Sequence, residues 1–180
     1  MSRTCGIASS VAQRHKRLER IVQKLARPSS TRLSVMQDIA GVRVAVRSLD
    51  ELRRLEEHIC SQWMSERAYT AGAVRRVVDY IDLPRETGYR AVHLIVSYNG
   101  RDAELQLRTE AQHTWAEAVE EVSRAISVEL KAGEIPAEIN EFFVEVGEVV
   151  FDIDFGHTVK WERTLDLRPW GSDLSLTVAT

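Results

Sequence analysis

Two carboxylates occupy apolar segments in which an unpaired charge would be costly to bury. Asp38 precedes the valine-rich run 39–46, and Glu104 lies in the alternating segment 101–108, close to Gln106. Mg²⁺ prefers a few carboxylates together with phosphate oxygens and water, and a carboxylate can also take a proton from an attacking hydroxyl. These residues indicate metal-dependent phosphoryl-group transfer, although each carboxylate taken alone is explained better by a structural role.

Basic residues near the start of the chain could bind the phosphates of such a substrate. In 14–27, apolar residues recur on one stripe and Lys16, Arg20, Lys24 and Arg27 recur on another, which predicts a helix with a basic face. Basic runs are more often simply solvated. Anion binding and solvation therefore both stay open for this segment.

A loop between apolar segments carries further candidates for ligand binding. Tyr89 follows Gly88, and an exposed aromatic ring on a tight turn offers a flat surface on which a base can stack. A tyrosine at the rim of the core explains Tyr89 equally well. Arg76 and Arg85 could bind an acceptor phosphate or could keep the loop solvated, and His93 taken alone is better explained as a strand histidine.

A predicted β-hairpin positions several of these side chains. Asn99-Gly100 favours a type I′ turn, which predicts strands over 91–98 and 101–108. If Tyr98 faces Arg101, paired residue numbers sum to 199. That register puts His93, Glu104, Gln106 and Arg108 on one face and turns Leu105 and Leu107 into the core.

The remaining elements predict an α+β fold, an α/β sandwich in which helices flank a mixed, mainly antiparallel sheet. Residues 39–46 read as a strand buried on both faces. Capping boxes at Ser48 and Thr109 predict helices from 49 to about 64 and from 110 to about 126. Pro136 predicts the start of a last helix whose glutamates face solvent. For residues 157–180 we assign only possible short strands.

Length and composition indicate one domain over residues 1–180. The chain has 180 residues, of which 44% are hydrophobic and 28% charged, with a net charge of −3. It shows neither a signal-peptide h-region nor an apolar run long enough to cross a bilayer, so we expect a cytoplasmic protein. Cys5 and Cys60 are too few for a disulfide framework or a zinc site, which leaves oxygen ligands for any metal.

Taken together, these segments resemble the synthetase domain of the RelA/SpoT family, in particular its small alarmone synthetases. The resemblance covers a motif core of about 14–120. A C-terminal helix and tail over 134–180 follow this core. Several ordered motifs carry it: Arg14-His-Lys16, Lys24-Leu-Ala-Arg27, Asp38-Ile-Ala-Gly-Val-Arg43, Asp79-Tyr-Ile81, Thr87-Gly-Tyr89 with His93, Glu104-Leu-Gln-Leu-Arg-Thr109 and Gln112-His-Thr-Trp-Ala-Glu117.

The resemblance implies a nucleotidyltransferase-like domain that transfers pyrophosphate from ATP to the 3′-hydroxyl of GDP or GTP, making the alarmone (p)ppGpp. It implies Mg²⁺ as cofactor, held by Asp38 and Glu104, with Glu104 also a candidate base. Similar small synthetases are homotetramers, so it also points to an oligomer. The ATP-binding residues would be Arg14, Lys16, Lys24, Arg27 and Arg43, and the acceptor-binding residues would be Arg76, Arg85, Thr87, Tyr89, His93 and Gln106.

Departures from the family pattern keep the acceptor and the oligomeric state open. Val78 stands where the family often has Lys, Thr87 where Asn is frequent, and Arg85 where Lys is common. One alternative is a toxic relative that pyrophosphorylates tRNA 3′ ends or adenine nucleotides. Another, from a different class, is a non-catalytic nucleotide- or RNA-binding module, against which the presence of both carboxylates argues.

Overall fold

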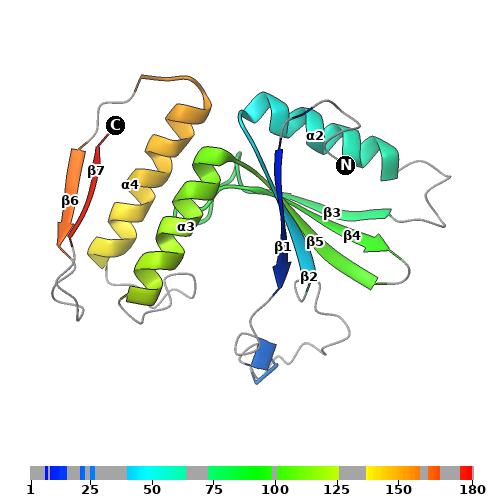
Figure 1. The fold of residues 1–180 in the computed structure, drawn as a ribbon, viewed down its shortest axis with the longest axis horizontal. Helices are drawn as coiled ribbons and strands as arrows, with labels where there is room; N and C mark the ends of the chain where they lie inside the picture. The colour runs from blue at the N-terminus through cyan, green and yellow to red at the C-terminus, as the bar shows by residue number, and fades with distance from the viewer. Residues whose placement is uncertain are drawn as a thin grey trace. The chain divides into compact units, whose positions relative to one another are not determined.

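A mixed five-stranded sheet with helices forms the fold, so the α+β prediction is confirmed (Figure 1). The computed structural model describes residues 7, 9–15, 21–22, 25–26, 40–63, 73–98, 101–125, 137–158, 162–166 and 175–179. Their contacts form two compact units, one of residues 1–79 with 91–108 and one of 80–90 with 109–180. Each unit is described by itself, and the single-domain assignment stays a prediction.

The first unit contains the five-stranded sheet, in the order β1-β2-β5-β4-β3. The neighbouring pairs β1–β2, β3–β4 and β4–β5 are antiparallel. Helix α2 contacts β2 and β3, and Figure 1 shows it along one face of the sheet. The bounds are Ser9–His15 for β1, Ala40–Val46 for β2, Leu49–Trp63 for α2, Ala73–Asp79 for β3, Val92–Tyr98 for β4 and Arg101–Thr109 for β5.

The β4–β5 hairpin has the register predicted from its turn. His93 pairs with Gln106, Ile95 with Glu104 and Tyr98 with Arg101, so paired numbers sum to 199. Leu105 and Leu107 are buried, as expected for the core-facing positions. The turn residues 99–100 lie outside the described residues, so the type I′ geometry stays a prediction.

The start of the helix predicted over 14–27 is wrong, because Arg14 and His15 belong to strand β1. Arg14 and His15 end a strand that pairs antiparallel with β2, whereas a helix was expected to begin at Arg14. Ile21, Val22 and Leu25 are helical, and the amide of Ala26 donates to the carbonyl of Val22. The pairing with β2 satisfies backbone groups of residues 9–15, which a helical pattern read from the sequence alone did not anticipate.

Strand β2 is less covered than expected. Val44, Ala45 and Val46 are buried, but Val42 keeps 37% of its surface exposed, so burial on both faces is confined to the second half of the strand. The capping box of α2 is confirmed in part. The Glu51 amide donates to the Ser48 hydroxyl at 3.2 Å, while the Glu51 carboxylate accepts from the amide of Arg47 and not from that of Ser48.

The second unit contains the loop 80–90, the contacting helices α3 (Glu110–Ala125) and α4 (Ala137–Asp154), and the two-stranded sheet of β6 (Glu162–Asp166) and β7 (Ser175–Ala179). These two strands fulfil the expectation of short strands in the tail. The capping box of α3 is reciprocal, because the Thr109 amide donates to the Gln112 side chain and the Gln112 amide donates to the Thr109 hydroxyl.

The apolar face of α4 packs as predicted, with Ile139, Phe142, Phe143, Val149 and Val150 buried. Its acidic stripe is not only solvent-facing, since Glu148 accepts a hydrogen bond from Arg90. Cys60 is a free thiol, whereas Cys5 lies outside the described residues. In the described part of the chain, no helix has the length and apolarity needed to span a membrane.

Candidate functional site

Strands β4 and β5 bring together four polar side chains, which we call the carboxylate face: His93, Glu104, Gln106 and Arg108. His93 Nδ1 lies 2.8 Å from Glu104 Oε1, and Gln106 Nε2 donates to Glu104 Oε2 at 2.7 Å. His93 and Gln106 are buried, and the Glu104 side chain keeps 12% of its surface exposed. The structure thus brings together three of the predicted site residues in one hydrogen-bonded group.

Arg108 extends this group and was given no role by the sequence argument. Its Nη2 donates to Gln106 Oε1 at 3.1 Å, and the residue is only 2% exposed. The Gln106 amide therefore receives a bond from a guanidinium and gives one to a carboxylate, which leaves a single orientation for its oxygen and nitrogen. The guanidinium in this way helps to orient the Glu104 carboxylate. Alternation along β5 placed Arg108 on the same face as Gln106, but the hydrogen bond between them is seen only in the structure.

The register of β3 extends the same face of the sheet. Val78 pairs with His93 and Arg76 pairs with Ile95, so both positions lie on the side of the sheet that carries His93 and Glu104. Arg76 is exposed, and a register shift separates it from Val74. Val78 is thus directly opposite His93 and adds no cation to this face.

Of the predicted ATP-binding residues, two lie in the described part of the chain. Ala12 pairs with Arg43 and Arg14 pairs with Gly41, so positions 14 and 43 are on the same face of the β1–β2 pair. Arg14 is described here by its backbone alone. Lys16, Lys24 and Arg27 lie outside the described residues, as does Asp38, so their assignments stay predictions.

Gly41 explains how β2 approaches the carboxylate face. A Cβ atom at this position would lie 2.5 Å from the backbone oxygen of Glu104, closer than real Cβ contacts allow. Glycine is therefore required for this approach of β2 to β5. Strand β2, which begins at Ala40, consequently runs beside the strand that carries Glu104.

A metal would need oxygen ligands at this face. The carboxylate of Glu104 is a hard oxygen donor of the kind that Mg²⁺ accepts, and it is already oriented by His93 and Gln106. Within the described ranges, no three His, Cys, Asp or Glu residues gather into a cluster that could hold a metal ion. Glu104 would need Asp38, water and substrate phosphates to complete a coordination sphere.

In the second unit, the loop 80–90 places Arg85 between two tyrosines. Arg85 Nη2 donates to the Tyr80 hydroxyl at 2.8 Å, and the guanidinium carbon lies 4.5 Å from the centre of the Tyr80 ring and 5.7 Å from that of Tyr89. The amide of Gly88 donates to the carbonyl of Arg85, which closes a turn that includes Thr87. The loop thus presents a cation and two aromatic rings in a defined geometry.

Tyr89 is not the exposed platform that was expected. The residue is 9% exposed, because its ring packs against Tyr80 at 5.9 Å and against Trp115 at 6.2 Å between centroids. The burial of Tyr89 favours the other interpretation, in which it is a tyrosine at the rim of the core. Its acceptor-binding role stays a prediction, as do those of Arg85 and Thr87. Tyr80 was named from the sequence only as part of the motif Asp79-Tyr-Ile81, and no sequence pattern predicted its contact with Arg85.

Comparisons with known proteins identify the family of this chain. Residues 13–124 match the family model described as a region found in RelA/SpoT proteins. An uncharacterised protein of Mycobacterium tuberculosis is 28% identical over 167 residues, which are 87% of this chain and 58% of that protein. The GTP pyrophosphokinase YjbM of Bacillus subtilis is 32% identical over 116 residues, or 59% of this chain and 52% of YjbM. The chain thus spans under two thirds of these relatives.

Solved structures show the same fold. Small alarmone synthetase 1 of Bacillus subtilis, bound to its product pppGpp, has a TM-score of 0.66 at 26% identity, covering 83% of this chain and 75% of that one. A GTP pyrophosphokinase family protein of Streptococcus pneumoniae has a TM-score of 0.65 at 27% identity, covering 83% and 73%. The matched region contains the carboxylate face and the loop 80–90. The chain belongs to the RelA/SpoT family.

Proposed function

We propose that the protein transfers pyrophosphate from ATP to the 3′-hydroxyl of GDP or GTP in a Mg²⁺-dependent reaction. The carboxylate face carries the proposal, because Glu104 is held by His93 and Gln106 within hydrogen-bond distance. The names of relatives support it: YjbM is a GTP pyrophosphokinase, and one similar synthetase structure contains pppGpp while another contains AMPCPP. We also expect a cytoplasmic location and an oligomer.

In the proposed reaction, the 3′-hydroxyl oxygen attacks the β-phosphorus of ATP. A new O–P bond forms, the bond between that phosphorus and the oxygen bridging to the α-phosphate breaks, and AMP leaves. Glu104 takes the hydroxyl proton, since a carboxylate within reach of a nucleophile can act as its base. Bound Mg²⁺ would neutralise charge on the transferred group.

Asp38 and Glu104 are the proposed metal ligands. Asp38 is three residues before Gly41, and three residues of extended chain span at most about 11 Å. Gly41 lies against the backbone of Glu104, and this proximity supports Asp38 as the proposed second ligand. Arg14, Lys16, Lys24, Arg27 and Arg43 would bind ATP. Arg76, Arg85, Thr87, Tyr89, His93 and Gln106 would bind the acceptor.

A second candidate function is favoured by Val78. This residue pairs with His93 on the face that carries Glu104, at a position where the family often has a lysine. Removing that cation suits an acceptor with fewer phosphates, such as a tRNA 3′ end, and an adenine nucleotide is the other acceptor of this candidate. Val78→Lys should then improve GDP and GTP as acceptors relative to tRNA.

Labelling with γ-³²P-ATP tests these functions directly. The protein is incubated with Mg²⁺ and with GDP, GTP, ADP or bulk tRNA, and each acceptor is examined for label. Label on a guanine nucleotide is expected, whereas label on tRNA or ADP alone would favour the second candidate. If no acceptor is labelled, the proposed enzyme is wrong and a nucleotide- or RNA-binding module takes its place.

Glu104→Gln is expected to lower labelling by at least about 100-fold, because general-base catalysis contributes about 10²- to 10⁴-fold. The amide keeps the shape of the side chain and cannot take the proton. Asp38→Asn should have an effect of similar size. Glu57→Gln, at an exposed position of α2, is the matched control and should leave labelling unchanged. Full turnover in Glu104→Gln would remove the assigned base.

A further inference from the structure

The loop 80–90 is packed against α4 through two glycines. Gly88 has a φ of 78°, and a Cβ added there would lie 3.0 Å from the Phe143 carbonyl oxygen and from the Val144 Cα. A Cβ added at Gly147 would lie 2.7 Å from the Gly88 carbonyl oxygen. Backbone therefore meets backbone at this point, and neither glycine can be replaced without moving the loop or the helix.

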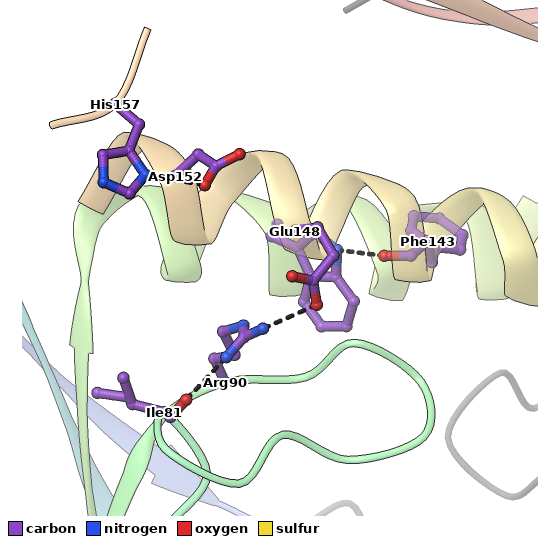
Figure 2. A network of polar contacts seen from close by, with 7 residues as sticks. Ile81, Arg90, Phe143, Glu148, Asp152 and His157 are labelled. Atoms are coloured by element: carbon purple, nitrogen blue, oxygen red, sulfur yellow. Dashed lines mark hydrogen bonds and ion pairs between the residues drawn. The ribbon is translucent and has the colours of Figure 1, made fainter. Parts of the chain in front are cut away.

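Arg90 ties both ends of the loop to the same helix (Figure 2). Its Nη1 donates to the carbonyl of Ile81 at 2.7 Å, and its Nη2 donates to Glu148 Oε1 at 2.8 Å. The guanidinium carbon also lies 4.3 Å from the centre of the Phe151 ring. Arg90 is 6% exposed, so its guanidinium is buried and these contacts hold the side chain in one geometry.

The contacts on α4 recur with helical spacing. Val144, Gly147, Glu148 and Phe151 are three or four residues apart, so they form one stripe along the helix. This stripe lies beyond residues 13–124, the residues that match the family model. Helix α4 therefore carries the surface on which the loop with Arg85 and Tyr89 rests.

We propose that Arg90 and the α4 stripe position the acceptor-binding loop, so that α4 controls how well the acceptor binds. This inference rests on the proposed function, in which Arg85, Thr87 and Tyr89 contact the acceptor. Displacing the loop moves these side chains together. The proposed ATP-binding residues lie elsewhere in the chain, in 14–43. Disturbing the stripe should therefore raise the KM for the acceptor and leave the KM for ATP unchanged.

Gly147→Ala is the sharpest test. Alanine favours a helix by about 1 kcal/mol over glycine, so α4 itself should not weaken. The added methyl group must push Gly88 away, and a displacement of about 1 Å can lower catalysis by about 100-fold. We expect the KM for GDP or GTP to rise about 10-fold or more, with the KM for ATP within about 2-fold of wild type. Glu141→Ala, at an exposed position of the same helix, is the control.

Glu148→Gln and Arg90→Lys test the ion pair. Glu148 is 58% exposed at its side chain, so the pair is partly screened, and we expect about a 2- to 5-fold rise in the acceptor KM for Glu148→Gln. Arg90→Lys keeps the charge, but a lysine cannot donate to Ile81 and Glu148 with the fork geometry of a guanidinium. The acceptor KM of Arg90→Lys should therefore be higher than that of wild type. Glu141→Gln is the charge-matched control and should behave as wild type.

Hydrogen exchange of the amides in 80–90 separates this inference from the proposed function. Faster exchange in Gly147→Ala, together with a selective rise in the acceptor KM, supports the inference. Unchanged exchange and unchanged KM overturn it, and so does an equal loss of ATP and acceptor use, which marks a purely structural role. If the wild type labels no acceptor, the proposed function fails. The exchange rates then still decide whether the stripe positions the loop.

Discussion

The carboxylate face and the loop 80–90 are assembled in opposite ways. The face consists of residues on two adjacent strands that follow one another in the sequence, and backbone pairing alone places His93 opposite Gln106. The loop has little backbone pairing of its own and is positioned by α4, where Glu148 is 58 residues beyond Arg90 in the sequence. Local pairing positions one group, and packing against a distant helix positions the other.

This difference predicts how each region responds to substitution. A side chain on the hairpin can be changed without altering the register, because the strand ladder uses main-chain atoms. A side chain that anchors the loop cannot be changed without moving the loop, because the position of the loop depends on the contacts of Tyr89 and Arg90. The following substitutions test this contrast, from the largest expected effect on stability to the smallest.

Tyr89→Ala should lower the free energy of unfolding by about 3 kcal/mol, the lower end of the usual range for truncating a buried aromatic side chain. The ring contacts Tyr80 and Trp115, so its loss leaves a cavity. Urea denaturation followed by circular dichroism measures the change. Tyr89→Phe keeps the ring and should lose much less. If Tyr89→Ala were as stable as wild type, the loop would not depend on this packing, and the contrast between the two regions would fail.

Gly41→Ala tests the other region of the comparison, because Gly41 on β2 lies against the Glu104 backbone beside the carboxylate face. Its Cβ would lie 2.5 Å from the Glu104 carbonyl oxygen, and overpacking of this kind typically costs about 1 to 3 kcal/mol. We expect a lower midpoint of thermal unfolding, with a loss of labelling because β2 moves away from Glu104. Gly156→Ala is the control: Gly156 has a φ of 72° but no atom within 4 Å of an added Cβ, so only backbone strain acts there. A Gly41→Ala protein that is as stable and as active as wild type would argue against crowding at Gly41.

Asp154→Asn tests a smaller, pH-dependent contribution in the second unit. Asp154 accepts hydrogen bonds from the Thr109 hydroxyl at 2.9 Å and from Gln112 at 2.7 Å. Burial raises the pKa of Asp154 above its ordinary value, although the two hydrogen bonds and the charge of Arg90 act in the opposite direction. The folded protein therefore holds this proton more tightly than the unfolded chain does.

The sign of the effect follows from that raised pKa. The contribution of Asp154 to stability is fully present below pH 3.8, its ordinary pKa, and is lost as the pH rises through the pKa of the folded state. Asparagine does not titrate, so the stability of Asp154→Asn relative to wild type should rise over this window and then level off. Urea denaturation at a series of pH values measures the difference. A difference that does not change with pH would contradict the raised pKa.

The hairpin and the capping boxes were predictable because their rules are local. The turn at residues 99–100 predicted a register that the pairs from Val92 with Leu107 to Tyr98 with Arg101 confirm. Thr109 and Gln112 exchange the two bonds that a capping box requires. In both cases the partners are close in the sequence, so spacing alone brings them together.

The errors share the opposite cause. Arg14 was expected in a helix but ends β1, because residues 9–15 pair with β2. Tyr89 was expected to be exposed, but Trp115 from α3 packs against it. Glu148 was expected to face solvent only, but it accepts from Arg90. Each outcome depends on a residue more than twenty positions away, and periodicity within a short window cannot report such a partner.

The sequence by itself determined the α+β fold class, the hairpin register and the polar side chains that share the face of Glu104. Only the tertiary structure decided that Arg108 orients Gln106, that Gly41 must be small to let β2 approach Glu104, and that α4 carries the loop 80–90. The physical reason is the range of the interactions. Periodicity and turn geometry act over a few residues, whereas close packing joins atoms that chain order keeps far apart.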